Sequence, residues 1–179
     1  MNSRLALTAV LTLALAGALA PAAQAQRPQV REGFWFSIGV GGGSLGCEEC
    51  DDRTNGGAGT LAFGGKLSNN VLLAGSANGW TRTEEGATLT VGLVAVEARF
   101  YPSATGGFFL KAGAGVGSAD LDFGSVTLSE TGAGALAGLG YDIRVGRMIS
   151  ITPWLQWFGI NYDPGNANVA QLGIALTIH

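Results

Sequence analysis

The chain has 179 residues, a formal net charge of −3 and 13% charged residues, whereas soluble domains carry about 25%. Its mean hydropathy is positive, at +0.30, and it contains 30 glycines. The size suits one domain. The scarcity of charge and the lack of any basic cluster in the sequence exclude a nucleic-acid-binding protein.

Residues 1–25 have the layout of a secretory signal peptide. Arg4 precedes an apolar run over residues 5–19, and Ala23-Gln24-Ala25 is a small-x-small cleavage site. The run is short for a membrane-spanning helix, so we expect cleavage after Ala25 rather than an anchor. Residues 26–32 then form a short, mobile periplasmic lead, and residues 33–179 form the folded domain.

Eight later segments alternate large apolar residues with small or polar ones, which is the two-residue period of a β-strand. We predict strands at 33–43, 58–67, 71–81, 87–101, 107–116, 131–145, 148–160 and 169–179. Long polar loops at 44–57, 82–86, 117–130 and 161–168 alternate with short turns. An even number of strands with short turns at one end is typical of a transmembrane β-barrel.

The last segment shows what surrounds these strands. One face is aliphatic throughout (Leu172, Ile174, Leu176, Ile178), and the opposite face is small or weakly polar (Gln171, Gly173, Ala175, Thr177). A soluble secreted barrel would carry polar residues on its outer face instead. The pattern predicts an all-β, eight-stranded antiparallel transmembrane barrel in the bacterial outer membrane, with both ends of the chain on the periplasmic side.

The loops and the aromatic residues support this orientation. The four long loops hold ten acidic residues and only the basic residues Arg53 and Arg82; the acids are Glu48, Glu49, Asp51, Asp52, Glu84, Glu85, Asp120, Asp122, Glu130 and Asp163. We expect this acidic end to face the exterior. Aromatic girdles at the two membrane interfaces are predicted from Phe34, Phe36, Trp80, Phe100, Tyr101, Phe108, Tyr141, Trp154, Trp157 and Tyr162.

Charged residues inside the strands are predicted to point into the lumen. A charge on the lipid side near the midplane would cost ~2–4 kcal/mol. We therefore predict a lumen ion-pair network of Glu97 and Asp142 with Arg99, Lys111 and Arg144. Side chains suffice to fill an eight-stranded barrel, so the network favours a plugged lumen with a structural role. The alternative is a small pore or a proton-conducting path through the same pairs.

Cys47-Glu48-Glu49-Cys50 leaves three interpretations open: a loop disulfide, a redox motif or half of a zinc site. We favour a disulfide between Cys47 and Cys50, since the sequence has no second cysteine pair and no internal histidine for zinc. The neighbouring carboxylates could attract Ca²⁺, but they lack a defined binding loop, and we predict no metal site.

An outer-membrane enzyme that modifies lipid is a further alternative. Catalysis of that kind uses a positioned imidazole as the base. The single histidine, His179, lies at the predicted periplasmic end. We therefore predict no enzymatic activity, no catalytic residue and no cofactor.

The pattern Gln171-x-Gly173-x-x-Leu176-x-Ile178 resembles the terminal signal of outer-membrane barrels, although His179 stands where an aromatic residue is usual. From about residue 33 onward, the chain resembles the small barrels of the OmpA-transmembrane-domain and OmpX type. The resemblance implies recognition by the barrel-assembly machinery and contact with outer-membrane lipid and lipopolysaccharide. We expect a monomer with a structural or surface-interaction role through its acidic loops; the extracellular ligand is not predicted.

Overall fold

The computed structural model describes residue 31 and residues 33–47, 52–123, 126–163 and 165–179. The predicted signal peptide and most of the predicted lead lie outside the described residues. No helix in the described part of the chain is long and apolar enough to cross a bilayer.

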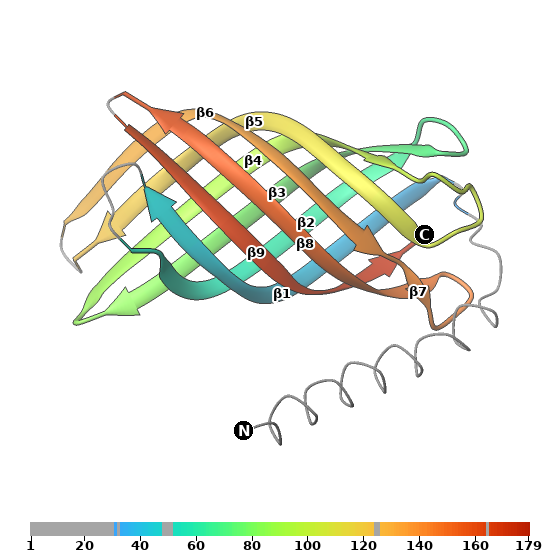
Figure 1. The fold of residues 1–179 in the computed structure, drawn as a ribbon, viewed down its shortest axis with the longest axis horizontal. Helices are drawn as coiled ribbons and strands as arrows, with labels where there is room; N and C mark the ends of the chain where they lie inside the picture. Colours follow the sequence, from blue (N-terminus) through green and yellow to red (C-terminus); the bar gives the residue numbers. More distant parts are fainter. Residues whose placement is uncertain (1–30, 32, 48–51, 124–125, 164) are drawn as a thin grey trace, which may run out of the picture.

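The chain forms one antiparallel sheet that closes on itself (Figure 1). Its strands are β1 (Phe34–Cys47), β2 (Thr54–Lys66), β3 (Val71–Glu84), β4 (Ala87–Phe100), β5 (Phe108–Asp122), β6 (Thr127–Tyr141), β7 (Ile143–Arg144), β8 (Ile149–Tyr162) and β9 (Gly165–Ile178). Consecutive strands pair with each other except β6 and β7, which both pair with β8, and β9 pairs with β1. Because β7 continues the line of β6, the wall is the predicted eight-stranded barrel.

The break between β6 and β7 has a local cause. The pairs Gly140↔Trp154 and Ile143↔Ile151 share one register, so only two rungs between them are missing. Pro153 has no N–H to donate to the first missing rung. On the other side of the break the pairing with β5 is intact, since the Asp142 N–H donates to the Gly107 carbonyl oxygen at 2.9 Å in the register of β5 and β6. The predicted strand 131–145 is therefore interrupted at Asp142.

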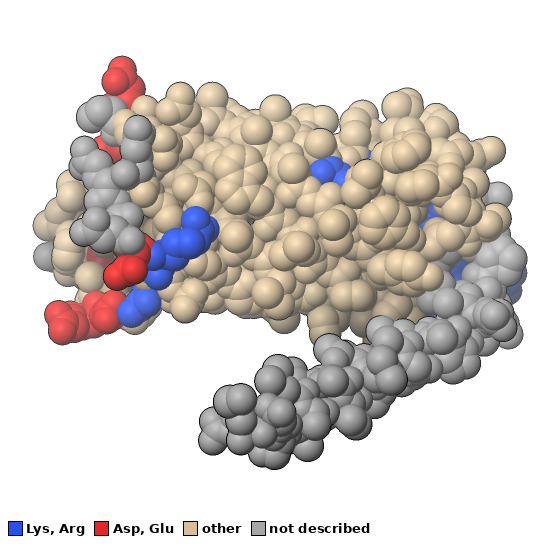
Figure 2. Space-filling view, viewed as in Figure 1, with Lys and Arg blue, Asp and Glu red and all other residues tan. Residues whose placement is uncertain are grey.

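The predicted alternation of β9 is confirmed. Leu172 and Ile174 are 66% and 60% exposed on the outer wall, whereas Gln171 and Thr177 are buried in the lumen. The same alternation runs around the barrel, and Figure 2 shows a broad band without acidic side chains along the visible face. Contact of these apolar side chains with water would be unfavourable, whereas in a bilayer they form the expected outer surface.

The predicted long loops are wrong in extent. At the end that holds the connections after β1, β3, β5 and β8, here called the acidic end, the strands continue well into the predicted loops. Residues 85–86 and 163–164 alone connect two of the strand pairs. Glu85 and Gly86 have φ of 50° and 84°, as the two central residues of a type I′ hairpin require. The opposite end, with the connections after β2, β4 and β7, is called the short-turn end.

The predicted aromatic girdles are only partly correct. Phe34, Phe36 and Trp157 are exposed on the wall, but Trp80, Tyr101 and Trp154 are buried inside the barrel. Trp80 points inward because every second residue of a strand shares one face, and the buried Ser76 and Asn78 lie on the same face of β3.

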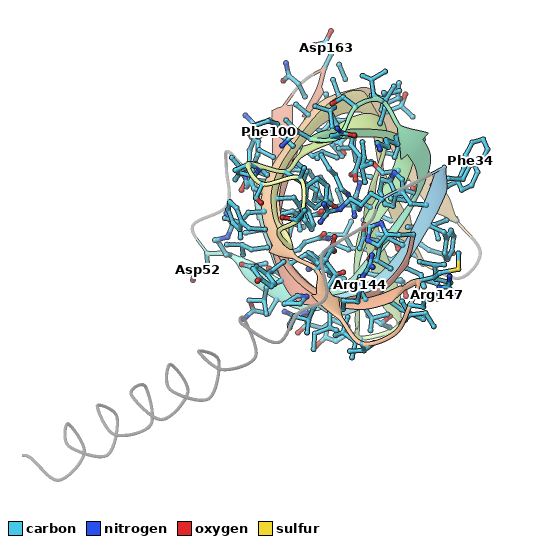
Figure 3. The ribbon with its side chains drawn as sticks, turned by 90° about the vertical axis from the view of Figure 1, so that its right-hand side faces the viewer. Phe34, Asp52, Phe100, Arg144, Arg147 and Asp163 are labelled. Atoms are coloured by element: carbon cyan, nitrogen blue, oxygen red, sulfur yellow. The ribbon has the colours of Figure 1, made fainter. Side chains whose placement is uncertain are left out.

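The lumen is filled with side chains, as the view from the short-turn end shows (Figure 3). Along the barrel axis these side chains form three layers. An apolar layer lies toward the acidic end and comprises Trp80, Val91, Leu93, Ala95, Leu136, Phe158, Ile160 and Val169. Buried amides and hydroxyls form the middle layer. Toward the short-turn end, charged groups lie among Trp35, Ala62, Leu72, Ala74, Tyr101 and Phe109.

Candidate functional site

The charged layer of the lumen contains two separate centres, and the first is built on Glu97. Its Oε1 accepts a hydrogen bond from Arg99 Nε at 2.8 Å, and its Oε2 lies 3.7 Å from Lys111 Nζ. The Arg99 guanidinium carbon lies 4.0 Å from the centre of the Trp35 ring and 5.0 Å from that of Phe109. One carboxylate thus faces two cations, and the aromatic rings offset part of the excess charge.

The second centre is Asp142, at the short-turn end. Its carboxylate accepts hydrogen bonds from Thr152 Oγ1 at 2.8 Å and from Tyr101 Oη at 3.0 Å. It also lies 3.6 Å from Arg31 Nη2 and 3.3 Å from His179 Nε2. All five side chains are buried, and two of them, Arg31 and His179, lie 148 positions apart in the sequence.

The sequence did not reveal the part played by Arg31. We expected residues 26–32 to be a mobile lead, but Arg31 is 5% exposed and is held inside the barrel. Its Nη1 and Nη2 donate to the carbonyl oxygens of Ala104 and Gly106 at 3.1 and 2.5 Å, and its guanidinium carbon lies 3.5 Å from the centre of the Tyr101 ring. Arg31, Tyr101, Asp142 and His179 form a clasp across the short-turn end, here called the Asp142 clasp.

Arg31→Ala is expected to lower the free energy of unfolding by ~1–3 kcal/mol, because it leaves buried acceptors without a donor. The measurement is the urea midpoint of the folded band on gels of unheated samples. Lys66→Ala is the matched control, since Lys66 is exposed at the same end. Equal midpoints for the two variants would contradict the role given to the clasp.

Arg144 is half-buried in β7, two residues after Asp142, and interacts electrostatically with Asp142 and Arg31. Cys47 ends β1, and Cys50 lies outside the described residues, so the disulfide stays a prediction. Glu48, Glu49 and Asp51 also lie outside the described residues.

The middle layer of the lumen is a network of amides. Gln156 Nε2 donates to Asn78 Oδ1 at 2.9 Å and to Gln171 Oε1 at 2.7 Å. Gln171 Nε2 then donates to the Gly79 carbonyl oxygen at 2.8 Å, and Thr60 donates to Asn78. These bonds tie four strands together across the lumen.

The predicted assembly-signal residues lie on both faces of β9, which pairs with β1 on one side and β8 on the other. Gln171 belongs to the amide network, and Leu176 and Ile178 face outward. Gly173 has a packing reason to be glycine, since a Cβ there would lie 2.8 Å from Trp154 Cζ2. Recognition of this strand by assembly machinery stays a prediction.

The acidic end carries the remaining acids of the described chain. They are Asp52, Glu84, Glu85, Asp120, Asp122, Glu130 and Asp163, gathered at one end of the molecule in Figure 2. The bases among the described residues there are Arg53 and Arg82. Arg82 Nη2 pairs with Glu84 Oε2 at 2.7 Å, and Arg53 is engaged with Ser44 and Asn168. The end therefore has an excess of negative charge.

The surroundings of His179 bear on the enzyme alternative. His179 is buried beside Asp142, and neither of its ring nitrogens has a hydroxyl partner. The Thr152 hydroxyl donates to Asp142 and not to the imidazole. Within the same residues, no three His, Cys, Asp or Glu side chains are placed to hold a metal ion.

Comparisons with known proteins agree with the fold. No protein-family model and no curated protein matches the chain. Neisserial surface protein A has 13% sequence identity and a TM-score of 0.64, with 84% of this chain and 99% of that chain covered. Ail, the attachment invasion locus protein of Yersinia pestis, has 20% identity and a TM-score of 0.57, with 82% and 99% covered.

The N-terminal β-barrel domain of Pseudomonas aeruginosa OprF is also similar, with 16% identity, a TM-score of 0.51, and 83% of this chain and 100% of that chain covered. Ail has also been solved in complex with the heparin analogue sucrose octasulfate. At these identities the likeness concerns the fold. The chain has the fold of the small bacterial outer-membrane β-barrels, which supports the outer-membrane location predicted from the sequence.

Proposed function

We propose that this protein is a non-conducting outer-membrane barrel that acts through its acidic end, which faces the exterior and attracts cationic partners. The observation that carries the proposal is the division of the molecule into a packed lumen and an end rich in carboxylates. A barrel whose interior is filled offers its surroundings only its wall and its rims. Of the two rims, the acidic one has the stronger charge imbalance in the described chain.

The packing of the lumen opposes the pore alternative. Leu93, Phe158 and Ile160 are buried in the apolar layer and fill the lumen near the acidic end. An ion would have to displace this layer and then cross the amide network. The lack of a hydroxyl bound to His179 likewise opposes a lipid-modifying enzyme.

The proposed partner chemistry differs from that in the Ail complex. Sucrose octasulfate is a polyanion, and an excess of carboxylates would repel it. We propose that this chain prefers polycations instead, with long-range attraction between its rim and basic segments of the partner.

Fluorescent polylysine is expected to bind the purified barrel in nanodiscs of neutral lipid, whereas sucrose octasulfate is not. The binding should weaken sharply between about 0.01 and about 1 M salt, as the Debye length falls from ~30 to ~3 Å. The triple variant Glu85→Gln, Glu130→Gln, Asp163→Asn should weaken it at low salt, whereas Lys66→Gln at the other end should not. Polylysine binding that is insensitive to salt and to the triple variant would contradict the proposal.

A further inference from the structure

The outer wall has a polar depression beside the β8–β9 hairpin. The β6–β8 ladder ends at Ala133↔Asn161, while β6 continues to Thr127 beside β5. The β5–β6 hairpin therefore rises past the β8–β9 hairpin and leaves a notch in the rim. Just below this step lies an open depression of about 540 Å³.

The floor and one side of the depression are shaped by very small residues and one indole. The depression is lined by Ala133, Ala135 and Gly159, whose side chains are too small to fill it. Trp157 is 46% exposed. Its ring lies beside Gly159 of the same strand, as the distance of 2.8 Å between Trp157 Cη2 and a Cβ built on Gly159 shows. The result is an accessible aromatic wall above a flat floor.

Three amides complete the lining. Asn161 and Asn166 face each other across the β8–β9 hairpin, and Asn168 is next along β9 on the same side. Asn168 Oδ1 accepts a hydrogen bond from Arg53 Nη1 at 2.7 Å. That bond orients the amide and leaves its NH₂ group as a donor. No charged side chain is among the described residues that line the depression.

The depression lies where the apolar wall ends. The outward residues of β9 are aliphatic from Ile178 to Leu172 and change to asparagine at Asn168 and Asn166. On β8 the same change falls between Trp157 and Asn161. The site therefore lies at the membrane boundary of the acidic end.

We propose that this depression binds a neutral saccharide, with a sugar ring packed on Trp157 and its hydroxyls bonded to Asn161, Asn166 and Asn168. A sugar presents an apolar C–H face and a rim of hydroxyls that both donate and accept. An exposed indole beside amides provides the matching surface, and the only charge bordering the lining among the described residues, that of Arg53, is engaged with Asn168 and Ser44. The proposal rests on the proposed function, since only an outward-facing acidic end meets the sugars of outer-leaflet glycolipids or free oligosaccharides.

The test is retention of a neutral glycolipid by the barrel in nanodiscs of phosphatidylcholine doped with digalactosyl diacylglycerol or, as reference, plain diacylglycerol. Lipid that stays with the barrel is counted by mass spectrometry. The wild type should retain the glycolipid over the reference. Trp157→Leu and Asn161→Ala should each reduce this preference about tenfold. Phe100→Leu, which removes an exposed aromatic residue at the other end of the wall, should leave it unchanged.

Competition by free maltoheptaose would support the proposal with a soluble sugar as the source, and retention without competition would support it with a lipid headgroup. Equal retention of both lipids, or equal effects of Trp157→Leu and Phe100→Leu, would overturn it. So would binding of an extended peptide to the β6 edge, abolished by Thr131→Pro, without any sugar retention. Both leaflets of the nanodisc carry the glycolipid, so the result does not depend on orientation or on the polylysine experiment.

Discussion

Glu97→Gln is expected to lower the free energy of unfolding by ~3–5 kcal/mol, which is the usual cost of breaking a buried ion pair by removing one partner. Glu97 is fully buried and is the carboxylate that Arg99 and Lys111 share. The amide of glutamine leaves both cations in the lumen with no counter-charge within ion-pair distance among the described residues. The measurement is urea unfolding in detergent micelles, followed by tryptophan fluorescence.

The control for this prediction removes a cation as well. The double variant Glu97→Gln, Lys111→Met should recover most of the lost stability, because one uncompensated charge is replaced by an apolar chain of similar length. Arg99 keeps its contacts with the Trp35 and Phe109 rings in that variant. A double variant less stable than Glu97→Gln alone would contradict the account of this centre.

Ile174→Lys is expected to destabilise the barrel in phospholipid vesicles by ~2–4 kcal/mol, if the residue lies near the bilayer midplane. Ile174 is 60% exposed, between Val40 and Pro153 on the outer wall. On a soluble protein an added lysine at such an exposed position would be nearly neutral. The size of the effect therefore reports whether lipid covers this wall.

Asn55→Lys is the matched control for the lipid-facing substitution. Asn55 is exposed on β2 near the acidic end, beyond the apolar band, and the cost there should be only ~0–1 kcal/mol. Unfolding measured in the same vesicles compares the two variants directly. Small effects for both would contradict a membrane-embedded wall.

The barrel itself was predictable because lipid imposes a strict period. From Leu172 to Ile178 every second residue of β9 is aliphatic, and the face of each residue there followed directly from that pattern. The inward position of Glu97, Arg99 and Lys111 followed from the cost of charge in lipid. These are local rules, and they hold strand by strand.

The rims were harder to predict because that constraint ends there. Beyond the membrane the outward face is no longer aliphatic, and the extended ends of β5 and β6 carry Ser118, Asp120 and Ser129 there, which are typical of a loop in sequence. The faces of Trp80 and Trp154 were missed because an aromatic residue suits both an interface and a lumen.

The clasp was missed for a different reason. Arg31, Asp142 and His179 are far apart in the sequence, and only closure of the barrel brings them together. Arg31, three residues before the first strand, was the available signal.

The most direct test of a closed barrel in the outer membrane is gel mobility of the protein from purified outer membranes, before and after heating. A closed barrel resists the detergent until it is boiled. We expect the protein in the outer-membrane fraction, with faster migration before heating than after. Identical mobility, with the protein in the soluble periplasmic fraction, would contradict the membrane barrel and leave the aliphatic wall as a surface for a ligand or partner.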